Sequence, residues 1–157
     1  FEPRWARIDG ESGLRSTSST GEMKLLVDAV LIPGKLFWAF NANWAPSYAQ
    51  DPTNRIQWLK STGANVSTAL TMGIGARAAL GIEVRQEAQF DGYGINRLMG
   101  RATFAGPTAV YRISEDVSIN GVYVAQVKGH ARGAGPARLD LDNFERHAFR
   151  IALTAGF

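Results

Sequence analysis

Two short segments of this sequence have residue types and spacings that could bind a ligand. The segment Gly73-Ile74-Gly75-Ala76-Arg77-Ala78 fits the G-x-G-x-x-A form of a dinucleotide-binding loop, which needs a helix directly after it. Apolar residues instead continue at every second position, at Leu80, Ile82 and Val84, so we predict a tight hairpin. The second segment could supply oxygen ligands for calcium from Asp140, Asp142, Asn143 and Glu145. It lacks the glycine and the spacing of an EF-hand, so we predict a solvated loop and no metal site.

Catalytic side chains are few. His130 and His147 are the only histidines, and a Ser-His-Asp site would need one of them. Both lie in or beside one loop, where we expect them to face solvent. The absence of cysteine excludes disulfides, thiolate metal sites and a cysteine nucleophile. We therefore expect no enzyme and no cofactor.

Composition favours one domain over residues 1–157, because this length is enough for a single core. The net charge of +3 is spread along the chain without a run of basic residues, so nucleic acid is a poor candidate partner. The longest apolar stretch, Leu25 to Ile32, is interrupted by Asp28 and is too short for a membrane helix.

Apolar residues alternate with polar or small residues along most of the chain, which indicates β-strands. In the clearest case Leu80, Ile82 and Val84 share one face, and Glu83 and Arg85 share the other. The predicted strands are about ten residues long and cover eight segments: 1–9, 22–31, 35–44, 65–74, 77–89, 98–113, 117–128 and 148–157.

The segment 98–113 changes phase. Ala109, Tyr111 and Ile113 keep one parity, whereas Ala102 and Phe104 keep the other. If all of them are to face the same side, a β-bulge is needed, and we predict it at Gly106-Pro107, where the phase changes.

Connections between the predicted strands alternate between short and long. Those at 32–35, 74–77 and 114–116 are tight, whereas those at 10–21, 46–63, 89–97 and 129–143 are long. In an up-and-down meander all the short turns then lie at one end, as in a bacterial outer-membrane barrel. We predict an all-β, antiparallel, up-and-down transmembrane β-barrel with about eight strands in this chain.

The last nine residues strengthen this prediction through a resemblance. Phe149, Ile151, Leu153 and Phe157 stand at alternate positions, with Ala155 between the last two, and Phe157 ends the chain. The segment resembles the C-terminal signal strand of outer-membrane β-barrel proteins, although that family often has a larger residue where Ala155 stands. The resemblance implies residence in the outer membrane of a Gram-negative bacterium and recognition of these four residues by the barrel assembly machinery.

If the apolar face meets lipid, the charged residues line the lumen. In an eight-stranded barrel they would form a polar plug, and in a wider barrel, of which this chain would be the C-terminal part, they would line a pore. The predicted function is accordingly a passive pore, a transporter wall or a structural barrel. The predicted lumen-lining residues are Glu22, Lys24, Asp28, Lys35, Arg77, Glu83, Arg85, Glu87, Arg112, Lys128 and Arg150.

Outer-membrane lipids are the expected partners. We expect cations of the last long loop to contact lipopolysaccharide phosphates, namely Lys128, His130, Arg132, Arg138 and Arg146. Two alternatives stay open. One is a soluble lipocalin-like barrel with the apolar face turned inward around a small apolar ligand, lined by Trp38, Phe40, Met72, Leu80 and Ile82. The other is an outer-membrane lipid-modifying enzyme using His130 or His147.

Overall fold

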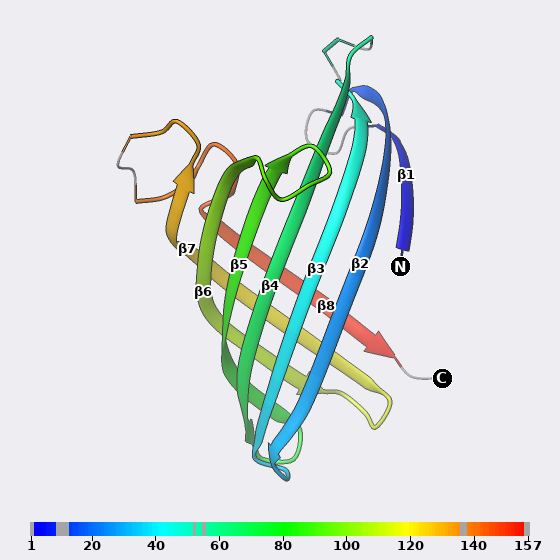
Figure 1. Ribbon diagram of the computed structural model, residues 1–157. Coiled ribbons are helices and arrows are strands. Elements are labelled where there is room, and N and C mark those ends of the chain that lie inside the picture. The colour runs from blue at the N-terminus through cyan, green and yellow to red at the C-terminus, as the bar shows by residue number, and fades with distance from the viewer. Residues whose placement is uncertain (1, 9–12, 52, 55, 136–137, 156–157) are drawn as a thin grey trace.

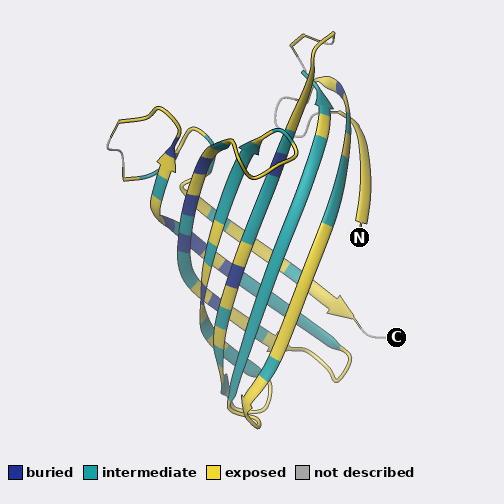
Figure 2. Ribbon diagram, in the orientation of Figure 1, coloured by how far each residue is buried: buried dark blue, intermediate teal, exposed yellow. Residues whose placement is uncertain are grey.

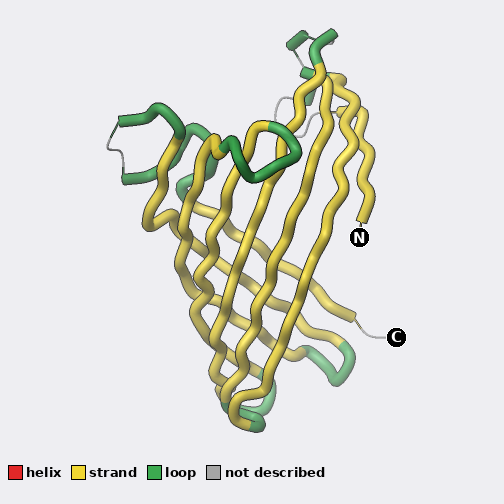
Figure 3. Tube along the Cα trace, viewed as in Figure 1, coloured by secondary structure: helices red, strands yellow, loops and turns green. Residues whose placement is uncertain are grey.

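The chain forms one antiparallel sheet in an up-and-down meander (Figure 1). The structure is a computed structural model and describes residues 2–8, 13–51, 53–54, 56–135 and 138–155. Its strands follow one another in the sheet in chain order: β1 (Glu2–Ile8), β2 (Arg15–Ile32), β3 (Leu36–Gln50), β4 (Trp58–Ile74), β5 (Ala78–Asp91), β6 (Leu98–Arg112), β7 (Val117–Ala131) and β8 (His147–Ala155). The tube in Figure 3 consists of strands and loops. No helix in the described part of the chain is long and apolar enough to cross a membrane.

The sheet curls into a half-barrel, so it has a convex and a concave face. The guanidinium of Arg150 on β8 lies 3.9 Å from the carboxylate of Glu83 on β5, although two strands separate them in the sheet. Only the concave face allows such a contact. Among the described residues β1 and β8 do not pair with each other, so each is an edge of the sheet.

Short and long connections alternate as predicted. The turns β2–β3, β4–β5 and β6–β7 are short, and the first two contain Gly34 and Gly75 at φ +67° and +68°. Glycine suits these positions because other residues rarely adopt a left-handed backbone. The longer loops lie at the other end of the sheet, which we call the long-loop end (Figure 1).

The strands are longer than predicted at the long-loop end. β2 has 18 residues and β3 has 15, and their ladder continues to the pair Ser18 and Ala49. The added residues are polar, and their side chains form hydrogen bonds between the two strands. For example, the Thr20 hydroxyl donates to Ser47 Oγ at 3.1 Å. The predicted loops at 10–21 and 46–63 were therefore too long, because hydrophobic alternation ends before the backbone pairing does.

The predicted bulge at Gly106-Pro107 is wrong. Gly106 pairs with Glu83 and Pro107 with Ile82 in an unshifted register, so β6 keeps one phase through this point. Ala102 and Phe104 face the concave side and are buried there. The apparent conflict of phase arose because these apolar residues belong to the inner face.

A bulge lies instead on β7. Thr103 pairs with Lys128 and Phe104 with Gln126, so Val127 is the additional residue. Thr103 lies on the convex face, and its partner Lys128 therefore lies there too. The prediction that Lys128 lines the lumen is wrong for this reason.

The long loop between β7 and β8 folds back onto the concave face. Gln126 Nε2 donates to the Asp140 carbonyl at 3.0 Å, and the Asp140 amide donates to Gln126 Oε1 at 2.9 Å. Asp140 is only 1% exposed, so the prediction of a solvated loop is wrong here. Gly100 and Gly129 permit this packing, because a Cβ on either residue would collide with Asp140. The buried stretches of β6 and β7 in Figure 2 lie around this contact.

We expect Gly129→Ala to displace this loop, because the new methyl group would collide with the Asp140 backbone, and overpacking of this kind costs about 1–3 kcal/mol. Limited proteolysis should cleave residues 132–146 faster in this variant. Gly121→Ala is the matched control on β7, since nothing lies within 4 Å of a Cβ there. Equal cleavage of the two variants would contradict the docked loop.

Candidate functional site on the concave face

The concave face collects most of the charged residues predicted to line a lumen. Glu83 lies on the concave face, and side chains alternate between the two faces along each strand. The pairing registers carry this assignment to the neighbouring strands and place the predicted lumen residues of the strands on the concave face. Lys35 and Arg77 lie in the short turns at the end of the same concavity, and Lys128 is the exception described above. The concave strand residues are Glu22, Lys24, Asp28, Glu83, Arg85, Glu87, Arg112 and Arg150.

Four of the concave charges form a cluster at the β1–β2 edge. Glu22 lies 3.0 Å from both Arg4 and Lys24, and Glu2 lies 3.3 Å from Arg4 and 2.9 Å from Lys24. Asn43 Nδ2 on β3 donates to Glu22 Oε1 at 2.8 Å. Sequence analysis did not assign Glu2 and Arg4 to the lumen, although their alternation with Pro3 and Trp5 could have placed them on the polar face.

A second cluster lies in the middle of the concavity. Arg85 Nε lies 3.0 Å from Glu87 Oε1, and the Arg85 guanidinium lies 5.2 Å from the centre of the Phe104 ring. Glu83 is 6% exposed and faces Arg150 across the curl. Opposite charges therefore alternate along β5, and they neutralise one another locally instead of giving the interior one sign.

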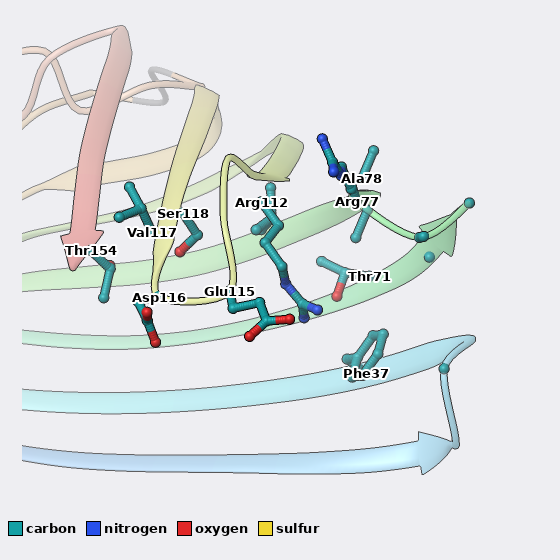
Figure 4. Close-up of a pocket in the computed structure, with 16 residues that line it drawn as sticks. Phe37, Thr71, Arg77, Ala78, Arg112, Glu115, Asp116, Val117, Ser118 and Thr154 are labelled. Carbon is teal, nitrogen blue, oxygen red and sulfur yellow. The ribbon is translucent and has the colours of Figure 1, made fainter. Parts of the chain in front are cut away.

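The short-turn end of the concavity is hollow. A hollow of about 740 Å³ opens between β3 and β8, lined mainly by small and polar side chains. Figure 4 shows Arg112 and Glu115 reaching into the same space as Thr71 and Phe37. Among the described residues Asp28, Lys35, Arg77 and Arg112 make no ion pair, so four charges remain available to water or to a solute.

The long-loop end is more filled. Phe144 packs edge-on against Phe104 at 6.5 Å between ring centres, so its ring points inward. At the same end of the sheet, the Asp51 carboxylate accepts hydrogen bonds from the Thr53 hydroxyl, the Thr53 amide and the Asn54 amide. These donors lower the pKa of Asp51, with the Thr53 hydroxyl contributing most.

The residues predicted to form the assembly signal lie on the opposite face. Phe149, Ile151 and Leu153 alternate along β8 on the convex side and are exposed. Phe157 lies outside the described residues. The three described side chains thus form part of the apolar surface.

The glycine-rich segment and the two histidines do not form a binding or catalytic site in the described part of the chain. Gly73 and Gly75 lie where β4 turns into β5, as a hairpin and not before a helix. His147 Nδ1 lies 2.9 Å from the Tyr123 hydroxyl, and no hydrogen bond in the described part of the chain joins either histidine to a carboxylate. Among the described residues no three potential metal ligands gather at one point.

Comparisons with known proteins give one match. A model described as a family of unknown function (DUF6662) matches residues 1–157. The chain belongs to this family. No curated protein and no solved structure matches the chain. For this DUF6662 chain, function must therefore be argued from the two faces of the sheet.

Phe104→Ala should destabilise the protein strongly, because Phe104 is 2% exposed and contacts Phe144. Removing a buried phenyl ring costs about 3–5 kcal/mol. Phe104→Leu is the control, since it retains apolar volume and should cost less. Chemical denaturation of the purified protein measures both. Unchanged midpoints for both variants would mean that Phe104 faces outward.

Proposed function

We propose that this chain forms the wall of an outer-membrane β-barrel, with its convex face in lipid and its concave face around a polar interior. Its role would be that of a passive pore, a transporter wall or a structural barrel. Closure requires the edges β1 and β8 to be paired, either with each other or with further strands, because unpaired backbone groups are costly in a bilayer. The residues of the described concave face carry no feature that calls for an enzyme.

The distribution of charge between the two faces carries this proposal. Among the described residues of β3–β8, every carboxylate lies on the concave face: Glu83, Glu87 and Asp91. The convex face of the same strands is apolar over their middle, with Leu70, Ile82 and Ile151 all about half or more exposed. A continuous apolar surface without carboxylates suits lipid, since a single soluble domain rarely exposes so large a patch.

The interior suits a weakly selective passage or a polar plug. Both signs of charge are present, and most of the charged strand residues are paired at 3.0–3.9 Å, either along one strand or between two strands. Such pairing favours neither cations nor anions. The hollow at the short-turn end supports a passage there, whereas Phe104 and the docked loop narrow the long-loop end.

Heat modifiability tests the proposal directly. We expect the protein to require detergent for extraction from an outer-membrane fraction, and its unboiled and boiled forms to migrate differently on a gel. A closed barrel resists detergent until heated, which explains the expected shift. A protein that stays in the aqueous fraction without detergent would contradict the proposal, and the search would turn to an apolar ligand.

A matched pair of substitutions on β5 tests whether the convex face contacts lipid or water. Ile82 is 64% exposed, and arginine there would cost about 2–4 kcal/mol at the middle of a bilayer, but little in water. Gln86→Arg, on the same strand and face but nearer the long-loop end, should cost about 0–1 kcal/mol. We expect Ile82→Arg alone to lower the amount of assembled barrel. Equal yields would indicate an aqueous surface.

A further inference from the structure

Three basic residues gather on the convex face where the apolar surface ends. Arg101 on β6 pairs with His130 on β7, and the next convex pair is Thr103 with Lys128. We call Arg101, Lys128 and His130 the convex basic cluster. All three side chains are exposed, and in the pairing register they lie nearer the long-loop end than the apolar residue Val84.

The bulge at Val127 creates this cluster. Without the additional residue, strict alternation would turn Lys128 toward the concave face and Gly129 outward. With it, Lys128 and His130 both lie on the convex side, beside Thr103 and Arg101. Bulges commonly redirect a side chain in this way at functional positions.

The cluster lacks a counter-charge among the residues that the structure describes. Arg101 and Lys128 stand at diagonal positions on neighbouring strands, about 7–8 Å apart, where two positive charges repel each other. No ion pair among the described residues involves Arg101, Lys128 or His130, and the convex face of β3–β8 offers no carboxylate in that part of the molecule. An anion from outside the chain would remove this repulsion.

The surroundings match a phosphate group. A hollow of about 170 Å³ is lined by the three basic residues together with Gln86, Thr103 and Gly129. The Arg101 guanidinium offers a planar fork of donors, Lys128 offers a compact charge, and the Gln86 amide and Thr103 hydroxyl add neutral donors. Charge-assisted hydrogen bonds of this kind are among the stronger ones.

We propose that the convex basic cluster binds the phosphate of a lipid headgroup. This rests on the proposed function, because a lipid meets the convex face only if that face lies in a membrane. A phosphate at this level would stand just beyond the apolar surface formed by Val84 and its neighbours, where a bilayer places its headgroups. The arginines of the β7–β8 loop, Arg132 and Arg138, are not part of this site.

Titration of the detergent-extracted protein with phosphatidic acid, followed by native mass spectrometry, tests the proposal. Diacylglycerol with the same acyl chains serves as the probe without phosphate. We expect the triple variant R101Q/K128Q/H130Q to bind phosphatidic acid at least about tenfold more weakly than the unaltered protein, with diacylglycerol binding unchanged. The double variant R132Q/R138Q is the control and should bind as the unaltered protein does. Retained heat-modifiable mobility shows that each variant is folded.

Normal phosphatidic acid binding by the triple variant would overturn the inference. So would equal binding of diacylglycerol, or displacement of phosphatidic acid by an equimolar amount of inorganic phosphate, which would identify a free anion as the ligand. Failure of the proposed function is visible separately, at the extraction step. A protein that needs no detergent contradicts both proposals, whereas a detergent-dependent barrel with a normally binding triple variant contradicts the lipid site alone.

Discussion

The alternation of side chains between the two faces of the sheet is the constraint on which the rest of this structure depends. A strand places neighbouring residues on opposite sides, so in each of the eight strands one half of the residues faces the concave side and the other half faces the convex side. Antiparallel pairing then extends each row across the sheet, so that a row such as Val66, Gln86, Thr103 and Lys128 lies on one face. The apolar surface, the inner ion pairs and the convex basic cluster are all products of this arrangement.

Contacts across the concavity hold the curl in addition to the backbone ladder. Arg150 reaches Glu83, and Phe144 reaches Phe104, so β8 and the loop before it are tied to the inner wall. The loop can approach because Gly100 and Gly129 have no side chains to obstruct Asp140. Small residues thus have a positive role here, since they leave room inside a curved sheet for one segment that carries larger groups.

The sequence was sufficient to predict the fold class, the tight turns and the concave face of eight of the eleven residues proposed to line a lumen, because each of these depends on local periodicity. The extent of the strands was not predictable from hydrophobicity, since polar pairs such as Thr20 and Ser47 sustain the ladder beyond the apolar rows. The bulge at Val127 has no local signature, because Val127 and Lys128 continue an apparently regular alternation. Phe104 was misassigned for a related reason: an apolar residue can belong to the inner face when a loop covers it.

The three short turns also bear on how the chain reaches this structure. Each joins strands that pair along nearly their whole length, so β2–β3, β4–β5 and β6–β7 are hairpins whose contacts are close in sequence. Ordering such contacts requires little loop entropy, and hairpins form within microseconds in isolation. The slow step should then be the association of preformed hairpins, ending with the docking of the β7–β8 loop. The long loops would then set the rate of assembly, because they connect the hairpins, and the short turns would define the hairpins that assemble.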